Sequence, residues 1–327
     1  MDSAAASLGS HDRSAPNAAA TRRHRRAAHH LIALITLAML ASALALVAPA
    51  ATSPAHAAPG VHPGGDWVDV AVGVHHVCAR SAKGEVRCWG SGFFGQLGNE
   101  SNVDIGDNAG EMGDNLATVD LGSGRTATAL AAGYLHTCAI LDDGNVKCWG
   151  RNANGELGVG NTFNLGDDPN EMGDDLPTVD LGTDRTATAI SAGDTHSCAL
   201  LDNGDVKCWG ANGDGQLGQG DKIVRGDNAG ELGDNLPAID LGLGRTAVAI
   251  SSNAKHNCVV LDNALVKCWG NNDDGQLGQG DTIDRGDDAP EMGDTLGAVL
   301  TGARAHSDGG AAGAERNCAK RVAHLRR

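Results

Sequence analysis

The tripeptide Cys-Trp-Gly occurs four times in this chain, and successive copies are sixty residues apart. They begin at Cys88, Cys148, Cys208 and Cys268, and another cysteine stands ten positions before each of them. A fixed period of this length indicates a tandem array of one small unit, whose apolar faces are buried against neighbouring units. The function of such a chain should lie on the surface that the units share.

Each unit consists of short strands and turns. In the second copy, apolar segments flank Asp142-Asp143-Gly144, and residues 176–181 and 186–190 also alternate as strands do. Glycine, asparagine and aspartate separate these segments, and no helical apolar period continues for a useful length. We therefore expect an all-β fold with about four short strands in each copy.

A different kind of segment precedes the repeats. Basic residues that end at Arg26 are followed by an apolar run from Leu31 to about Ala48, and then by the small-residue site Ala55-His56-Ala57. This order is typical of a bacterial secretory signal. We expect residues 1–57 to be a signal peptide and residues 58–65 a linker, so that the mature protein is secreted, periplasmic or at the cell surface. An uncleaved anchor or a misplaced start codon are the alternatives.

Export determines how the nine cysteines are interpreted, because none of them lies in the signal segment. If Gly144 adopts the left-handed conformation in a three-residue turn, Ile140 faces Val146 and Cys138 faces Cys148. The cysteines then form a non-hydrogen-bonded pair, where a cross-strand disulfide fits. We predict the bridges Cys78–Cys88, Cys138–Cys148, Cys198–Cys208 and Cys258–Cys268, and we predict that Cys318 is unpaired.

A metal site is the competing interpretation of the cysteines. One histidine lies two residues before the first cysteine of each copy, at His76, His136, His196 and His256. However, no Cys-x-x-Cys pair is present, and each copy supplies two thiolates, whereas four-ligand sites draw on tighter spacing. We therefore interpret these histidines as structural hydrogen-bonding groups and predict no cofactor that uses them.

Units of about four strands that repeat at this length are the signature of propeller blades. The blocks Gly-x-x-His-x-Cys-x-x-Leu, Asp-Gly-x-Val-x-Cys-Trp-Gly and Asn-x-x-Gly-x-Leu-Gly resemble the repeats of the regulator of chromosome condensation family, whose superfamily includes the secreted β-lactamase inhibitory protein II. The resemblance covers nearly all of residues 66–300 and implies a seven-bladed β-propeller. This chain departs from the family in one respect. Its cysteines occupy strand positions that are ordinarily apolar or hydroxyl residues in the family.

The number of blades departs from the family. The array covers residues 66–302, with copies near 66–125, 126–185, 186–245 and 246–302, and residues 303–327 are a degenerate partial fifth copy with a basic tail. An incomplete propeller would leave strand edges exposed at both ends. A truncated or frame-damaged reading frame, a small closed ring, and ring closure between two chains with Cys318 as a possible staple remain as explanations.

Charge limits the choice of partner. The whole chain has a formal net charge of −16. The first 57 residues contain five arginines and two aspartates, and residues 303–327 contain six basic and two acidic side chains, which leaves the array near −23. Such a surface repels phosphate backbones. The chromatin binding that the resemblance implies is therefore not expected here, and we expect no nucleic-acid partner. The exchange activity on a small GTPase that the resemblance also implies is not expected outside the cytoplasm.

The carboxylates gather in one glycine-rich excursion of each copy. The clearest sets are Asp167, Glu171 and Asp174 in the second copy and Asp227, Glu231 and Asp234 in the third. Calcium prefers several oxygen ligands on such loops, so a low-affinity calcium site in each copy is one interpretation. The other is that these residues form turns and keep an exported array soluble. A fixed ligand order such as Asp-x-Asp-x-Asp-Gly is absent from the sequence.

No catalytic constellation is evident, because residues that recur in every copy serve the fold before they serve a single site. We therefore predict a non-enzymatic, secreted or cell-surface protein-protein interaction scaffold that presents repeat loops on one propeller face. The alternative is a calcium-dependent structural or adhesive module. Selectivity for an unknown protein partner is expected in loop residues that vary between copies, namely Phe93, Phe94, Tyr134, Phe163 and Lys222 to Val224.

Overall fold

The computed structural model describes residues 66–299, all within the unit that spans Val61–Arg327. These residues form four antiparallel three-stranded sheets, one for each full copy of the repeat. The predicted signal peptide, the linker up to residue 65, and the fifth copy with Cys318 lie outside the described residues. The prediction of an all-β repeat fold is confirmed for the four full copies.

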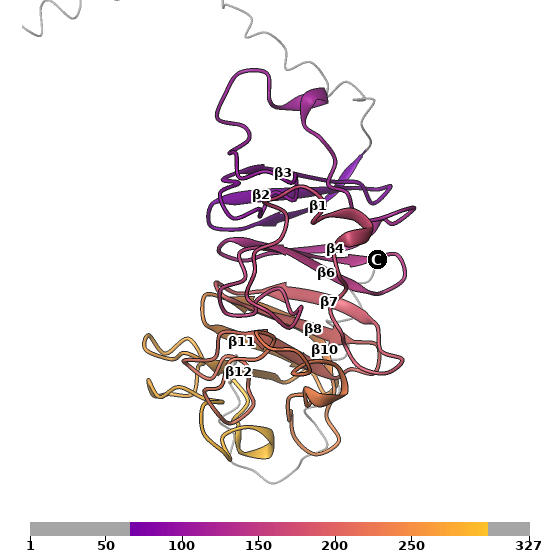
Figure 1. The fold of residues 1–327 in the computed structure, drawn as a ribbon. Helices are drawn as coiled ribbons and strands as arrows, with labels where there is room; N and C mark the ends of the chain where they lie inside the picture. Colours follow the sequence, from indigo (N-terminus) through magenta and orange to yellow (C-terminus); the bar gives the residue numbers. More distant parts are fainter. Residues whose placement is uncertain (1–65, 300–327) are drawn as a thin grey trace, which may run out of the picture. The chain divides into compact units, whose positions relative to one another are not determined.

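The strands recur at equivalent positions. In each sheet the second strand lies between the first and the third. The strands are β1 (Trp67–Val72), β2 (His76–Ser81), β3 (Val86–Gly90), β4 (Ala127–Ala132), β5 (His136–Leu141), β6 (Val146–Gly150), β7 (Ala187–Ala192), β8 (His196–Leu201), β9 (Val206–Gly210), β10 (Ala247–Asn253), β11 (His256–Leu261) and β12 (Val266–Gly270). Figure 1 shows the four sheets following one another in chain order.

A single-turn 3-10 helix follows the third strand of each copy. These helices are η1 (Gly113–Asn115), η2 (Gly173–Asp175), η3 (Gly233–Asn235) and η4 (Gly293–Thr295). Among residues 66–299, no helix has the length and apolar character needed to cross a membrane.

The hairpin between the second and third strands has the predicted register. In the second copy the Leu141 amide donates to the Asn145 carbonyl at 2.8 Å, and Gly144 has a φ of 81°, which glycine adopts without steric cost. Cys138 therefore lies opposite Cys148. The structure contains the disulfides Cys78–Cys88, Cys138–Cys148, Cys198–Cys208 and Cys258–Cys268, the pairs expected from this register.

The prediction of four strands in each copy is wrong, because each sheet has three. The expected strand at residues 176–181 contacts β6 through an isolated bridge between Thr178 and Lys147 and one hydrogen bond from the Val179 amide to the Val146 carbonyl at 2.8 Å. Pro177 has no amide hydrogen to extend this pairing. The alternation instead reflects burial, since Leu176, Val179 and Leu181 all face the core.

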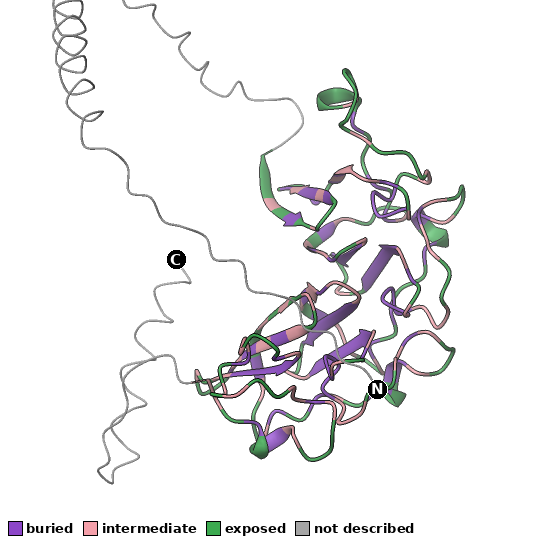
Figure 2. Ribbon diagram, turned by 90° about the vertical axis from the view of Figure 1, so that its left-hand side faces the viewer, coloured by how far each residue is buried: buried purple, intermediate pink, exposed green. Residues whose placement is uncertain are grey.

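Neighbouring copies pack sheet against sheet, β1 against β4, β4 against β7 and β7 against β10. The disulfide and Val146 of one copy pack in one cluster with Ala199, Leu201 and Trp209 of the next. The indole of Trp209 is fully buried there and donates to the Glu156 carbonyl of the preceding copy at 3.1 Å. Trp149 and Trp269 are buried in the same way and donate to the equivalent carbonyls of Gln96 and Gln216. Every residue of β5, β6, β8 and β9 is buried, and Figure 2 shows buried strands at the centre of the described chain.

Candidate functional site

The loops at one end of the sheets form a common surface. In an antiparallel sheet, the turn between the first two strands and the chain that leaves the third strand meet at the same end. The Ser91 amide donates to the His75 carbonyl at 2.8 Å, and Arg151 pairs with Leu135 in the same way at 2.9 Å. We call this end the loop face. It comprises residues 73–75, 133–135, 193–195 and 253–255 together with 91–105, 151–165, 211–225 and 271–285.

Four large apolar side chains project from equivalent positions of the loop face. They are Val103, Phe163, Ile223 and Ile283, which are 57%, 75%, 60% and 60% exposed. We call these four residues the apolar row. Single exposed apolar residues are ordinary on protein surfaces, but an exposed apolar residue at the same place in every copy is a repeated surface feature.

The backbone under the apolar row is held firmly. The amides of Phe163, Ile223 and Ile283 donate to the side-chain oxygen two residues earlier, at 2.9 Å, 2.9 Å and 3.1 Å. Such local turns fix the chain without using the apolar side chain. The apolar side chains therefore face solvent from an ordered support, which reduces the entropy lost when a partner binds.

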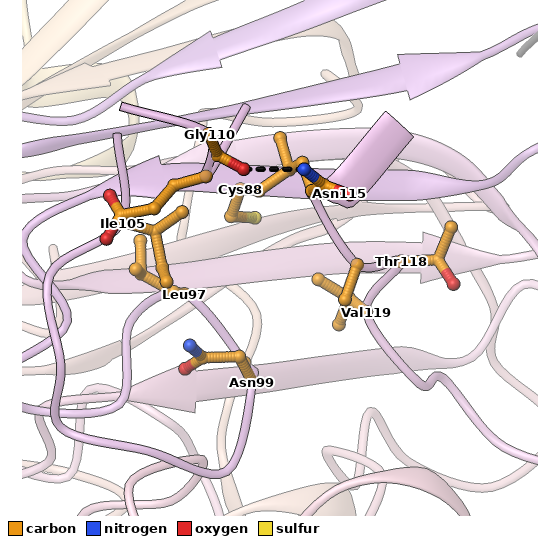
Figure 3. A pocket seen from close by; sticks show the side chains of 12 residues that line it. Cys88, Leu97, Asn99, Ile105, Gly110, Asn115, Thr118 and Val119 are labelled. Carbon is orange, nitrogen blue, oxygen red and sulfur yellow. Dashed lines mark hydrogen bonds between the residues drawn. The ribbon is translucent and has the colours of Figure 1, made fainter. Parts of the chain in front are cut away.

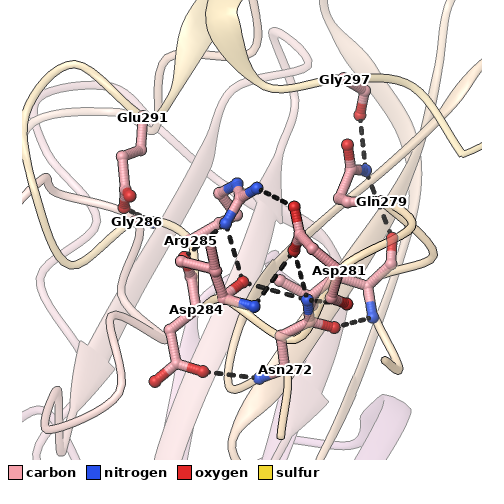
Figure 4. A network of polar contacts seen from close by, with 10 residues as sticks. Asn272, Gln279, Asp281, Asp284, Arg285, Gly286, Glu291 and Gly297 are labelled. Atoms are coloured by element: carbon pink, nitrogen blue, oxygen red, sulfur yellow. Dashed lines mark hydrogen bonds and ion pairs between the residues drawn. The ribbon is translucent and has the colours of Figure 1, made fainter. Parts of the chain in front are cut away.

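The fourth copy shows this support in full (Figure 4). The fully buried Asn272 donates its amide hydrogens to the carbonyls of Asp281 and Ile283, both at 3.0 Å. The Arg285 guanidinium pairs with the Asp281 carboxylate at 2.7 Å and also donates to the Ile283 carbonyl at 2.8 Å. The side chains of Asn272 and Arg285 therefore both bind the carbonyl of Ile283.

Aromatic groups cover the loop face over the first two copies. Phe93 is 65% exposed and lies edge-on to Phe94, with ring centroids 4.9 Å apart. Tyr134 is 37% exposed and lies edge-on to His75 at 5.2 Å. These are residues that the sequence indicated as variable, and tyrosine and phenylalanine are common in protein-binding surfaces.

Over the third and fourth copies, two ion pairs accompany Ile223 and Ile283. Lys255 pairs with Asp214 at 3.0 Å, and Lys222 pairs with Asp287 at 2.9 Å. The hydrogen bond that Lys255 donates to the Asp214 carboxylate, together with the negative charge of Asp214, raises the pKa of Lys255. Because these pairs are exposed to solvent, they contribute little to stability but set the charge pattern of the surface.

The acidic excursions follow the loops of the apolar row along the chain. The Glu171 carboxylate accepts the amides of Gly166 and Asp168 at 2.8 Å and 2.9 Å, and Glu231 accepts the amides of Gly226 and Asn228 at 2.9 Å and 3.1 Å. Each of these glutamates therefore closes its own loop. The amide of Asp167 also donates to Glu171, at 3.2 Å.

Two of the remaining acidic candidates, Asp174 and Asp234, bind the preceding copy. Asp174 accepts hydrogen bonds from the hydroxyl and the amide of Ser123, and these bonds hold its pKa below the ordinary value. Asp234 accepts the same two bonds from Thr183, which lower its pKa as well. Within residues 66–299, no group of three or more His, Cys, Asp or Glu side chains gathers around a point that could hold a metal ion.

Three of the four predicted structural histidines are buried and form hydrogen bonds between copies, whereas His256 is half-buried and has no such bond to a residue within 66–299. His76 Nε2 lies 2.8 Å from Thr137 Oγ1, His136 Nε2 3.0 Å from Ser197 Oγ, and His196 Nε2 2.9 Å from Asn257 Oδ1. Burial lowers the pKa of His76 to about 4, of His136 to about 3 and of His196 to about 4. These imidazoles are neutral near pH 7, and their neighbouring cysteines are paired in disulfides.

A cavity of about 290 Å³ lies in the first copy, lined by Leu97, Ile105, Leu116 and Val119 among others (Figure 3). One titratable side chain, Glu111, lines it. Its carboxylate accepts the amides of Asn108 and Gly106, and these bonds lower its pKa. The cavity thus offers no nucleophile paired with a base, which catalysis of acyl or phosphoryl transfer would need.

Sequence reasoning identified Phe163 and the stretch around Ile223, but it did not recognise the apolar row. The signal was present in the sequence. In every copy an apolar residue follows a serine, asparagine or aspartate by two positions within an otherwise polar loop, and that pattern predicts a tight turn with an outward apolar side chain.

Comparison with known proteins agrees with this geometry. Residues 67–96, 127–156, 187–216 and 247–276 match the family described as "Regulator of chromosome condensation (RCC1) repeat", and residues 143–200 match a second description of that repeat. Human E3 ubiquitin-protein ligase HERC2 is 31% identical over 218 residues, which are 66% of this chain and 4% of the relative. The Ultraviolet-B receptor UVR8 of Arabidopsis thaliana is 27% identical over 218 residues, 66% of this chain and 44% of the receptor.

Two solved structures share the fold. Yeast RCC1 (Prp20), in its complex with Kap60, superposes with a TM-score of 0.50 at 21% identity, over 67% of this chain and 47% of that chain. Human WBSCR16 superposes with a TM-score of 0.51 at 19% identity, over 68% and 54% of the two chains. The chain thus spans less than two thirds of the length of each of these proteins.

Four sheets in series, each presenting equivalent loops at one end, define a protein of the β-propeller repeat class. The sixty-residue unit identifies the kind of blade. The chain belongs to the regulator of chromosome condensation repeat family, in a disulfide-containing form.

Proposed function

We propose that this protein is a secreted or cell-surface scaffold without catalytic activity, which binds another protein through its loop face. The observation that carries the proposal is the apolar row, in which Val103, Phe163, Ile223 and Ile283 each project from a rigid turn at the same repeat position. Exposed apolar groups that have polar neighbours and recur on one face are typical of protein-binding surfaces.

The chemistry of the partner follows from the charge pattern. The array carries a net charge near −23, and the loop face combines apolar side chains with carboxylates such as Asp194 and Asp273. The partner we propose is a protein with an apolar patch bordered by lysine or arginine, since opposite charges speed association and disfavour wrong partners. Yeast RCC1, which shares the fold, was solved in complex with the protein Kap60.

The export part of the proposal rests on the predicted signal segment and on the disulfides. Four disulfides in a chain of this size are typical of proteins that fold in an oxidising compartment. The partner is accordingly expected outside the cytoplasm.

The test is a binding experiment with the full mature chain. Wild-type protein is immobilised, partners are captured from the extracellular fraction of the producing cells, and each captured protein is titrated against variants by biolayer interferometry. In the double variant Phe163→Asp with Ile223→Asp, two members of the apolar row become charged. We expect a specific partner to lose affinity by about tenfold or more, the size of effect typical of central apolar contacts.

The control is Leu243→Asp. Leu243 is 87% exposed in the loop after β9, outside the loop face, so the variant makes the same kind of change elsewhere on the surface. A partner whose affinity falls with Leu243→Asp as much as with the double variant, or with neither, would contradict the proposed surface. Unchanged disulfides and far-ultraviolet circular dichroism would show that all variants are folded.

A further inference from the structure

A hydrogen-bond relay crosses every junction between consecutive copies. The imidazole Nε2 of one copy meets a side chain of the next copy, which in turn donates to a carbonyl of the first. Thr137 donates to the Gln96 carbonyl at 3.0 Å, Ser197 to the Glu156 carbonyl at 2.9 Å and Asn257 to the Gln216 carbonyl at 2.6 Å. We call the place of Thr137, Ser197 and Asn257 the junction position.

The junction position has a strict chemical requirement. Its side chain must accept a hydrogen bond from a buried imidazole and donate one to a buried carbonyl. Threonine, serine and asparagine differ in size and shape, but each carries both an acceptor and a donor. An unpaired polar group in this interior costs free energy of folding. A face that carries this imidazole and carbonyl is therefore expected to pack against a copy with a suitable side chain at the junction position.

The outer face of the fourth copy is the face turned away from the third copy. It has the same imidazole and carbonyl groups, which need a side chain that can accept and donate. His256 and Cys258 are half-buried there, whereas the equivalent His196 and Cys198 are fully buried. Within residues 66–299, neither His256 Nε2 nor the Gln276 carbonyl has a hydrogen-bond partner. Among the described residues, this face therefore presents an apolar surface with an unpaired donor, His256 Nε2, and an unpaired acceptor, the Gln276 carbonyl. The two groups correspond to those that are paired at each internal junction.

The first copy of a second chain does not fit that face. Its residue at the junction position is Val77, which has no side-chain donor or acceptor. Its Trp67 occupies the place of Ala127, Ala187 and Ala247, which are buried at the other junctions. Trp67 is instead 44% exposed and covered on one side by the Arg87 guanidinium, 5.8 Å from its ring centre. The first copy of a second chain thus lacks the hydrogen-bonding side chain that the outer face of the fourth copy requires.

The chain itself supplies a matching residue. The sixty-residue register places Asn317 at the junction position, next to Cys318, after Ala312-Gly313 in the place of Ala192-Gly193. The connecting length also matches. The Ile239 amide donates to Val206 and lies eighteen residues before Asn257, while the Val299 amide donates to Val266 and lies eighteen residues before Asn317.

We propose that residues 311–319 of this chain pack on the outer face of the fourth copy, where Asn317 accepts the hydrogen bond of His256 and donates to the Gln276 carbonyl. The interaction is intramolecular, so it needs no second copy and no added partner. It ends the array by repeating the internal junction with a fragment of a blade.

Chemical labelling of histidine in the full mature chain tests this proposal. Diethyl pyrocarbonate at pH 7 modifies accessible neutral imidazoles, and mass spectrometry of peptides gives the rate at each site. His75, which is exposed, and His196, which is buried, serve as internal references. We expect His256 to react on the order of tenfold more slowly than His75, because its Nε2 is engaged.

Two substitutions separate the proposed contact from general stability. Asn317→Val introduces the residue found at position 77 and should raise the His256 rate to that of His75. Asn317→Ser introduces the residue found at position 197 and should leave His256 protected. His196 should stay protected in both variants, which shows that the array is folded.

Equal labelling of His256 in wild type, Asn317→Val and Asn317→Ser would overturn the proposal. Protection of His256 that disappears on dilution, with a dimer in light scattering, would also overturn it and would assign the face to a second copy of the chain.

Discussion

At the scale of single residues, the junctions between copies depend on a side chain that can accept and donate at once. Ser197 accepts from His136 and donates to the Glu156 carbonyl, and the indole of Trp209 donates to the same carbonyl. The sequence shows Thr, Ser and Asn at this position in copies 2 to 4, which looks like free variation. The structure shows that their common hydrogen-bonding capacity is what the position requires.

Ser197→Val should therefore destabilise the array. It removes both hydrogen bonds and leaves the His136 Nε2 hydrogen unpaired in a buried site, at a cost of about 1–3 kcal/mol. Urea unfolding monitored by tryptophan fluorescence measures this change. Ser197→Thr, which introduces the residue of the second copy, is the control and should change the free energy of unfolding by less than about 1 kcal/mol. Equal stability of both variants would show that the relay is not needed.

The buried histidines make stability depend on pH. Burial lowers the pKa of His76, His136 and His196 to about 4, 3 and 4, below the ordinary value of 6.5. Between these values the unfolded chain binds more protons than the folded chain, so the free energy of unfolding falls as the pH falls below 6.5. Each histidine contributes up to about 1.4 kcal/mol per pH unit. Urea titrations at pH 7.5, 6 and 5 check this slope, and a flat profile would contradict the burial.

At the scale of elements, the long excursions are tied to the array by carboxylates. The Glu100 carboxylate of the first copy accepts the amides of Asn170, Glu171 and Met172 at 2.9, 3.2 and 3.2 Å. These contacts place the excursion of the second copy against the first, and Met172 is buried as a result. Glu171 and Glu231, which resembled calcium ligands in the sequence, likewise accept backbone amides.

Glu100→Ala should loosen one excursion while leaving the sheets intact. Loss of a charged acceptor shared by three amides should speed hydrogen exchange at residues 170–172 by on the order of tenfold. Hydrogen-exchange mass spectrometry resolves this region from β5 and β8, whose exchange should not change. Glu85→Ala is the matched control, since Glu85 is exposed. Faster exchange throughout the second copy would mean that the carboxylate supports the whole sheet.

At the scale of the whole molecule, the disulfides and the signal segment predict one maturation route. We expect the exported chain to begin at Ala58 and to carry its four bridges within the hairpins, because cysteines that face each other across a strand pair oxidise locally. N-terminal sequencing and non-reducing peptide mapping of the secreted protein test both points. A product that retains the leader, or one with free thiols at Cys138 and Cys148, would contradict this route.

Much of the fold could be predicted because the repeat is local. The sixty-residue period determined the number of full copies, and the turn at Gly144 determined the register that brings Cys138 to Cys148. The prediction of a strand at residues 176–181 was wrong. The alternation of apolar residues there reflects burial against the core and not pairing with a neighbouring strand. Periodicity alone does not distinguish these two causes.

The sequence by itself determined the unit, its hairpin and its disulfides, because those contacts join residues that are close along the chain. Tertiary structure decided which side of each unit meets its neighbour, and therefore which polar residues are shared at a junction and which apolar residues form the row on the loop face. Contacts between copies depend on how one sheet packs against the next. That packing brings residues about sixty positions apart into contact, and no local pattern in the sequence specifies it.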